Sequence, residues 1–574
     1  MSPTQDISSY DYIICGGGTS GCVVAARLAE DPRLKILVLE AGPDSADLEN
    51  VHMVGGWSSN FDSETDWNII TNPMRGVDDR QVKLSRGRFL GGCSGCNGTL
   101  CIRGCKQDYD DWGLEGWSGE EFFKCMSKAE TFHPKPWLDS VEAAHGSSGP
   151  IHTEPHDLTP ISKRIMDSFI SKGMPFSADM FSTGEVPHGC GHAVRTVYKG
   201  LRSTSADYIT KDQHKDNITI LCNHSADNII LEPHNGGLLA KGVAAISTVD
   251  NARHTFHATR EVIVSGGAYC SPAILMRSGI GPQEDLDKHG IACKVNLPGV
   301  GTNLMDHLIV AIFYETEEGL TSDHLVYHEG AFHKSYAQWK EQKSGFLSSF
   351  PFGAFAFARV DDLLANEPAW ANAPREEGRD PMGLTPRQPN IELFNTECYG
   401  GPKQYDIYPT DKHAFSLIAE LFSPKSRGSV KLKSADPLEP PAVDCNYLDD
   451  PLDMLVLTEA CRFGNEIMTE GLGTKDVLKG SWPPELKHHT FKTRDEWIPY
   501  VKEHATTCYH PGGTCAMGKP DDPKAVLDEK LRVRGVTGLR VADCSVMPLL
   551  HGGHNQMPAY GIGEKCAELI KSGN

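Results

Sequence analysis

Apolar and polar positions near the N-terminus follow a strand–helix–strand pattern. A short apolar run at 12–15 leads into a glycine-rich turn, and a second apolar run at 36–39 ends at Glu40. Between the two runs, small and apolar residues recur through a helical stretch. Strands that alternate with helices are typical of a parallel sheet. The pattern therefore predicts a strand–helix–strand unit at the start of the chain.

The turn in this unit has the spacing of a dinucleotide-binding site. Gly16 permits the tight turn, Gly18 lets the backbone approach a pyrophosphate, and Gly21 lets helix and strand pack closely. The helix N-terminus attracts the phosphates. Glu40 follows about 20 residues later, where an acid accepts hydrogen bonds from a ribose diol and disfavours NADP. The predicted binding residues here are Gly16, Gly18, Thr19, Ser20, Gly21, Glu40 and Ala41.

Size and charge limit the class of protein. At 574 residues, two or more domains are expected. The formal charge of −21 argues against nucleic acid or an anionic membrane as a partner. No apolar run is long enough to span a membrane, and the polar residues 1–10 lead directly into the first strand. A cytoplasmic location is expected.

The middle of the chain contains two kinds of pattern. Segments 217–232 and 242–264 alternate as strands, and the second leads into another glycine-rich turn and helix at 266–281. From about 310 to 500, aromatic and polar residues alternate, and strand-like runs at 414–422 and 428–432 follow. This stretch predicts an antiparallel sheet with covering helices. Its aromatic residues are Phe313, Tyr314, Phe350, Phe352, Phe355, Phe357 and Phe394.

A run of small residues at 87–97 suggests backbone close to a flat group, such as a flavin ring. The alternative, a flexible surface loop, is weakened by apolar neighbours such as Phe89 and Leu90. The run and the residues after it also carry cysteines that raise an iron–sulfur or zinc interpretation, but their spacing resembles no common zinc pattern closely. Buried or locally functional thiols are favoured over a metal, and no metal site is predicted. The cysteines are Cys93, Cys96, Cys101 and Cys105.

The last 75 residues return to glycine-rich motifs that carry histidines. A His-Pro-Gly-Gly-Thr-Cys-Ala-Met-Gly run begins at His510, and a His-Gly-Gly-His run ends at His554. Between them, a short apolar run ends at Asp543, and a final helix is expected over 561–570.

Together these motifs resemble, in order and over nearly the whole chain, the glucose–methanol–choline (GMC) family of FAD oxidoreductases. The segment 267–281 is similar to the family's second signature. The first signature is recognisable at 87–97, but Cys93 stands where Ser or Thr is usual. Cys96 stands where an aliphatic residue or a flavin-linking histidine is usual, so FAD is expected to be held without a covalent bond. A thioether to Cys96 is the less favoured alternative.

The resemblance implies an α/β fold, in which a Rossmann-like FAD-binding domain is interleaved with an α+β substrate domain built on an antiparallel sheet. The expected FAD-binding parts are 1–155, 201–309 and 506–574, with a substrate-domain excursion at 156–200 and a substrate-binding domain at 310–505. Besides the residues of the first turn, the expected FAD contacts are Arg88, Gly92, Cys93, Asn97, Asp543 and Gln556. Asp543 could equally stabilise the end of its strand.

The resemblance also implies that His510 and His554 face the reactive part of the flavin. Alcohol oxidation needs a base for the hydroxyl proton and a group that holds the alkoxide, and histidine suits both roles. His510 is assigned as the base and His554 as the partner of the substrate oxygen, with a partial exchange of roles left open. Tyr509 is assigned to the substrate wall. His307 and His551 are weaker candidates, expected to be structural.

The expected reaction is oxidation of a primary alcohol to an aldehyde, with hydride transfer to the flavin. Formate oxidase carries Arg, and choline oxidase Asn, at the position of His554, so this histidine favours alcohol oxidation. The alternatives are a non-redox lyase of the hydroxynitrile lyase kind and an FAD-binding protein without catalysis. The small-molecule alcohol is left open, as is the electron acceptor, O2 or another. The aromatic residues of 310–400 favour an aromatic or apolar substrate, but core packing explains them equally well.

Overall fold

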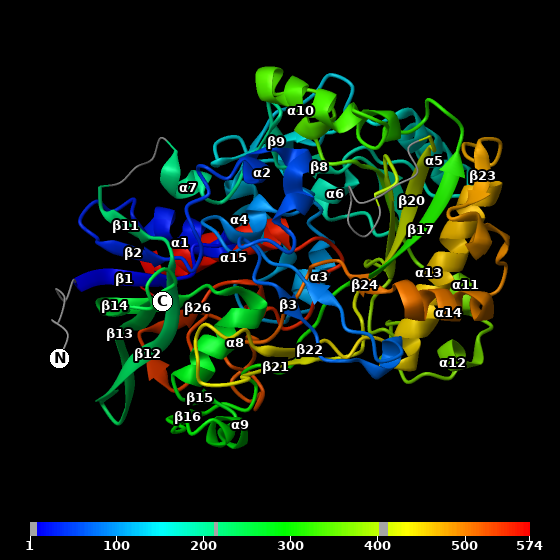
Figure 1. The fold of residues 1–574 in the computed structure, drawn as a ribbon. Coiled ribbons are helices and arrows are strands. Elements are labelled where there is room, and N and C mark those ends of the chain that lie inside the picture. The colour runs from blue at the N-terminus through cyan, green and yellow to red at the C-terminus, as the bar shows by residue number, and fades with distance from the viewer. Residues whose placement is uncertain (1–8, 212–215, 401–410, 574) are drawn as a thin grey trace.

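Two large sheets occupy opposite halves of the molecule (Figure 1). The computed structural model describes residues 9–211, 216–400 and 411–573. The half at the left of Figure 1 carries the first sheet, and the half at the right carries the second sheet with its covering helices. Segments from the start and the end of the chain meet between them.

The first sheet contains the predicted strand–helix–strand unit at its centre. Its order is β11-β2-β1-β14-β13-β12, with β26 beside β14 and β25 beside β13. The strands β11, β2, β1, β14 and β26 run parallel, whereas β12, β13 and β14 pair antiparallel. The bounds are β1 Ser9–Cys15, β2 Ile36–Leu39, β11 Ile218–Leu221, β12 His224–His234, β13 Gly237–Ser247, β14 Arg253–Val264, β25 Val536–Thr537 and β26 Leu539–Val541. Both predicted apolar runs are therefore neighbouring strands.

Helices α1 (Thr19–Leu28) and α15 (Gln556–Lys571) pack side by side on this sheet (Figure 1). The predicted start of the final helix at 561 is wrong, because α15 begins five residues earlier. Pro558 fits the first turn, where no intrahelical N–H bond is needed. The glycines of α15 allow it to pack closely on α1. A Cβ on Gly563, for example, would lie 2.7 Å from Val23 Cβ.

The second sheet is antiparallel throughout, as predicted for 310–500. Its order is β23-β17-β20-β19-β18-β7, with β24 also paired to β17. The central strand β20 is buried along its whole length, because both of its faces are covered. The bounds are β7 Gly189–Gly191, β17 Leu308–Thr316, β18 Phe352–Ala358, β19 Ile391–Thr396, β20 Ala414–Leu421, β23 Leu478–Ser481 and β24 Thr506–Thr507.

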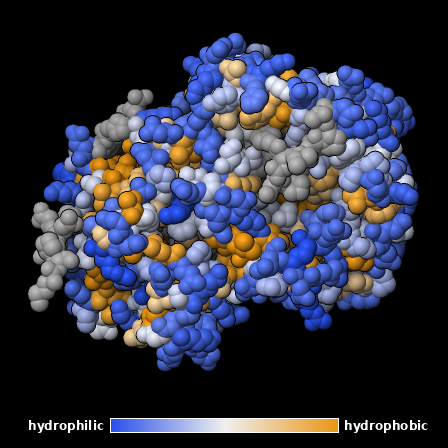
Figure 2. Space-filling model, viewed as in Figure 1, coloured by the Kyte–Doolittle hydropathy of each residue, from blue (hydrophilic) through white to orange (hydrophobic). Residues whose placement is uncertain are grey.

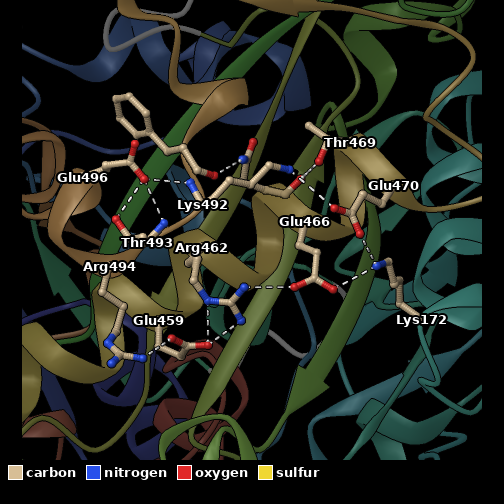
Figure 3. Close-up of polar contacts among 12 residues, drawn as sticks. Lys172, Glu459, Arg462, Glu466, Thr469, Glu470, Lys492, Thr493, Arg494 and Glu496 are labelled. Carbon is tan, nitrogen blue, oxygen red and sulfur yellow. Dashed lines mark hydrogen bonds and ion pairs between the residues drawn. The ribbon is translucent and has the colours of Figure 1, made fainter. Parts of the chain in front are cut away.

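Ion pairs connect the helices at the outer side of the second sheet (Figure 3). Glu459 of α13 (Pro451–Glu470) pairs with Arg462 at 2.7 Å and with Arg494 of α14 (Arg494–His504) at 3.1 Å. Lys172, just after α5 (Pro160–Ser171), contacts Glu466 at 2.8 Å. The network joins three helices that are distant in sequence. The remaining helices of ten or more described residues are α4 Gly119–Lys128, α8 Gly267–Arg277 and α10 Ala331–Gln342.

Polar residues dominate the outer surface on the face shown in Figure 2, and apolar residues gather near the middle, between the two halves. Among the described residues, no helix is long and apolar enough to cross a membrane.

Candidate active site

A cavity of about 480 Å³ lies between the two sheets, and separate stretches of the chain form its wall. The glycine turn before α1 lies at one end, together with the turn before α8. The loop at 92–98 and the motifs that carry His510 and His554 contribute further wall residues. The second sheet adds aromatic side chains. The motifs that the sequence analysis singled out thus meet around one space.

The glycine turn has the geometry that its spacing predicts. Gly16 has a φ of +114°, and a Cβ there would lie 2.4 Å from the carbonyl oxygen of Ser265. A Cβ on Gly21 would lie 2.0 Å from the carbonyl oxygen of Gly16. A Cβ on Gly18, by contrast, would meet only one atom, at 4.0 Å, and Gly18 lines the cavity with Thr19 and Ser20. Room for a close-approaching group is therefore left where a pyrophosphate is expected.

Glu40 directly follows β2 and lines the same part of the cavity, together with Ala41. Its two carboxylate oxygens accept backbone hydrogen bonds from Gly17 at 3.0 Å and Gly42 at 2.9 Å. Burial raises the pKa of Glu40 to about 7. Each oxygen keeps a further lone pair, which suits the hydroxyls of a ribose.

The loop at 92–97 presses against the glycine turn. Gly91 and Gly92 both have positive φ, and a Cβ on Gly92 would lie 2.9 Å from Gly18 Cα. This approach places Cys93, Cys96 and Asn97 in the cavity wall.

Gln556, the first residue of α15, lies on the same wall and accepts a hydrogen bond from the Asn97 amide. Its own Nε2 is buried and has no partner among the described residues. A bound flavin would offer that amide an acceptor, so these residues fit the cofactor.

Two predicted contacts have other partners in the structure. The Asp543 carboxylate accepts bonds from the backbone of Gly267 at 3.0 Å, from the Ser271 hydroxyl at 2.6 Å and from the backbone of Ser545 at 2.7 Å. Asp543 lines the cavity, but its carboxylate organises the start of α8. Arg88 is absent from the described cavity wall, and its guanidinium lies over the Trp67 ring.

His510 and His554 meet at the other end of the cavity. Their ring centroids are 4.6 Å apart, and both line the wall. His510 Nδ1 lies 3.0 Å from His307 Nδ1, which leaves His510 Nε2 as the ring nitrogen available to the cavity. Burial lowers the pKa of His510 well below its usual value, and the neighbouring histidines, His554 first, add to this. A neutral His510 with a free lone pair is the form that a general base needs.

Asp306 fixes the backbone that carries His510. It accepts hydrogen bonds from the backbone N–H of His510 at 2.9 Å, from Thr507 at 2.6 Å and from the Tyr447 hydroxyl at 2.5 Å. Tyr509 adopts a left-handed φ of 61°, which is uncommon outside glycine. The buried carboxylate holds this turn in place, and Tyr509 lines the cavity as predicted.

Two buried glutamates behind the histidines were missed by the sequence analysis. Glu392 of β19 and Glu420 of β20 are paired across the strands, and both are fully buried. Glu392 Oε2 lies 2.8 Å from His554 Nε2, and Glu420 Oε1 lies 3.1 Å from His307 Nδ1. Burial raises the pKa of both carboxyls. The available signal was a lone acid within each otherwise apolar run.

These histidines and glutamates form two overlapping groups, His307–Glu420–His510 and Glu392–Glu420–His554, whose ligand atoms lie within 4.8 Å. The spacing could hold a metal ion. Three of their buried atoms, His307 Nε2, Glu392 Oε1 and Glu420 Oε1, have no hydrogen-bond partner among the described residues. His307, expected to be structural, is therefore a direct neighbour of His510, whereas the His551 ring bonds the Asn555 amide at 3.1 Å.

The fold and the site define the protein as an FAD-dependent oxidoreductase. Family models described as GMC oxidoreductase match residues 10–309 and 424–563. The chain belongs to the GMC oxidoreductase family, and its cofactor is FAD.

Relatives and solved structures match the chain nearly end to end. The oxygen-dependent choline dehydrogenase of Burkholderia lata is 33% identical over 587 residues, which cover 98% of this chain and 93% of the relative. A crystal structure of formate oxidase aligns with a TM-score of 0.91 at 31% identity and covers 100% and 99% of the two chains. A fungal aryl-alcohol oxidase aligns with a TM-score of 0.80 at 25% identity and covers 98% and 99%.

Proposed function

We propose that the protein oxidises a primary alcohol to the aldehyde, with His510 as the general base. The observation that carries the proposal is the pair of cavity-lining imidazoles, His510 and His554, with ring centroids 4.6 Å apart. Two of the similar proteins are named for alcohols, choline and aryl alcohols. When bound, FAD supplies the acceptor for the hydride, which no side chain can provide.

The two histidines divide the work on the substrate hydroxyl. His510, kept neutral by burial, takes the hydroxyl proton at Nε2. Glu392 Oε2 lies 2.8 Å from His554 Nε2, and because burial raises the pKa of this carboxyl, it can donate its proton to Nε2. His554 can then donate from its other nitrogen to the substrate oxygen as negative charge develops there.

The wall of the cavity favours an aromatic or apolar alcohol. Phe313, Phe350, Phe352 and Phe394 line it, and Phe394 also belongs to the core cluster that holds Phe355 and Phe357. Tyr509 adds another ring. The core-packing explanation therefore applies to only part of the aromatic set, and an aryl alcohol is the substrate class that we favour.

We also infer a division into two interleaved domains. The FAD-binding domain comprises 1–155, 201–309 and 506–574, and the substrate domain comprises 156–200 and 310–505. Every strand of the first sheet falls within the former set. The second sheet draws on the latter, with β24 and the first two residues of β17 contributed across the boundary.

Anaerobic mixing of the purified holoenzyme with aryl, aliphatic and amino alcohols and with formate tests the activity. We expect aryl alcohols to abolish the flavin absorbance band fastest, and admission of air tests O2 as the acceptor. Reduction by formate alone, or none by any alcohol, would contradict the proposal. Cyanide release from a cyanohydrin without loss of the band would support a lyase instead.

A further inference from the structure

Two cysteines lie three positions apart on the flavin-facing loop. Cys93 lies within the 3-10 turn Gly92–Gly95, and Cys96 directly follows it. Both thiols are partly buried, and both line the cavity. Cys96 Sγ lies 3.9 Å from the Cys93 carbonyl oxygen, so the two side chains leave neighbouring positions of one tight turn. The loop thus holds a Cys-x-x-Cys pair against the cofactor site.

A guanidinium group contacts only one of the two sulfurs. Arg86 Nε donates to Cys93 Sγ at 3.1 Å, and another Arg86 nitrogen donates to the Tyr509 carbonyl at 2.8 Å. Among the ion pairs of the described residues, none joins Arg86 to a carboxylate. The Cys93 sulfur is therefore the group that can supply an anion to this cation, as the thiolate.

The two thiols consequently differ in character. The contacts with Cys96 and Arg86 lower the pKa of Cys93, whereas the pKa of Cys96 is raised by Cys93 and by burial. Another cavity cysteine shows the contrast, since burial raises the pKa of Cys270 to about 12. A thiolate beside a protonated thiol is the arrangement of a nucleophilic and a resolving cysteine.

We propose that Cys93 and Cys96 form a peroxide-reactive dithiol that closes to a reversible disulfide in the wall of the flavin cavity. The oxidant is hydrogen peroxide, the product formed when a reduced flavin is reoxidised by O2. The proposal rests on the proposed function in one respect, O2 as the acceptor, and does not depend on which substrate the enzyme oxidises.

The reaction balances with one peroxide. The Cys93 thiolate attacks one peroxide oxygen and the O–O bond breaks, so that hydroxide leaves and takes a proton to become water. The Cys96 thiol then loses its proton, and its sulfur attacks the sulfenic sulfur of Cys93. The S–O bond breaks, and hydroxide leaves with that proton as a second water. The two sulfurs lose two electrons together, and the peroxide gains them.

Closure would remove the negative charge beside Arg86 and tie Cys96 to the residue next to Gly92. A Cβ on Gly92 would lie only 2.9 Å from Gly18 Cα, so this part of the loop has little freedom to move away from the glycine turn. We expect the disulfide form to have a shifted flavin absorbance spectrum.

Differential alkylation of the holoenzyme tests the pair. Tryptic cleavage after Arg88 and Arg103 leaves Cys93, Cys96 and the buried Cys101 on one peptide, so Cys101 serves as an internal reference. After peroxide, we expect Cys93 and Cys96 to resist iodoacetamide together, with the peptide lighter by two hydrogens and restored by dithiothreitol. Unchanged alkylation of both, or oxidation of Cys93 without the disulfide, would overturn the proposal.

Variants separate the two roles. In Cys96→Ser we expect Cys93 to stop at the sulfenic acid, which dimedone captures. In Arg86→Gln we expect alkylation of Cys93 at pH 7 to slow at least tenfold, with flavin absorbance and circular dichroism reporting whether the variant folds. The matched control, Cys270→Ser, should leave the Cys93 rate unchanged. If iodoacetamide alkylates Cys93 of the unsubstituted enzyme no faster than Cys270, Cys93 is not a thiolate and the proposal is wrong.

Discussion

At the scale of single residues, the catalytic proposal depends on how differently two neighbouring imidazoles are surrounded. His510 Nδ1 contacts His307 and, at 3.4 Å, Glu420, and Asp306 holds its backbone, whereas His554 Nε2 contacts Glu392. Burial and the neighbouring histidines lower the pKa of His510. Different surroundings for two titratable groups are a common way to divide acid and base roles.

Replacing His510 with alanine should reduce the rate of flavin reduction by about 10²–10⁴, because a placed general base contributes that much. Stopped-flow reduction by the best alcohol measures it, with the flavin content checked by absorbance. The control variant is His289→Gln, because His289 follows helix α9 (Gln283–Lys288) and lies outside the described cavity wall. Its rate of flavin reduction should stay within about twofold of that of the unsubstituted enzyme. Near-normal reduction by the alanine variant would rule out His510 as the base.

The pH dependence of kcat/KM should follow the lowered pKa of His510. A base works only when it is deprotonated, so activity should persist as the pH falls past 6.5 and decline only near the lowered pKa. Rate measurements from pH 5 to 8 with a substrate that does not titrate check this. A loss centred at or above pH 6.5 would show that another group is the base.

At the scale of elements, the ion network of Figure 3 joins α13, α14 and the end of α5. Its members differ in exposure: the Glu459 side chain is 1% exposed and that of Glu470 is 48% exposed. Exposed pairs contribute little to stability, whereas removal of one partner from a buried pair is costly. Glu459 is therefore the residue on which the network depends most.

Glu459→Gln should lower the free energy of unfolding by about 2–4 kcal/mol, because Arg462 and Arg494 lose their buried counter-charge. Glu470→Gln, the matched control, should cost about 0.5 kcal/mol or less. Urea unfolding followed by circular dichroism measures both. Equal effects of the two substitutions would mean that burial does not govern the strength of the network.

At the scale of the whole molecule, the FAD cavity joins segments that the two sheets hold apart. Residues from the glycine turn, the 92–98 loop, α8 and α15 share one wall. A ligand that binds only when all of them are in place stabilises the whole fold by mass action. Folding and cofactor binding are therefore coupled.

Removal of FAD should lower the melting temperature. Restoring FAD at a thousandfold excess over its Kd should raise the free energy of unfolding again by about 4 kcal/mol.

We expect acid precipitation to release the flavin, since Cys96 occupies the place of the family's linking histidine. Flavin that stays with the precipitated protein would contradict noncovalent binding.

Glu40→Gln should weaken FAD binding about tenfold, because hydrogen bonds to a charged group contribute roughly 1.5–3 kcal/mol. An unchanged affinity would contradict the role of Glu40.

The local patterns predicted a large part of the fold. The runs at 12–15 and 36–39 became β1 and β2, and the aromatic stretch after 310 became an antiparallel sheet. The start of α15 was placed five residues too late, and the missed first turn contains Pro558. Proline is tolerated there because the first N–H groups of a helix make no intrahelical bond.

Residue types at short spacing were enough to locate the glycine turn at 16–21, the small-residue loop at 87–97 and the two histidine motifs. No such pattern could show that Glu392 and Glu420, from neighbouring strands, lie behind His554 and His307. The fold also brings Arg86 Nε to 3.1 Å from Cys93 Sγ. The physical reason is that charge and burial act through space, between groups that the chain brings together only when it folds.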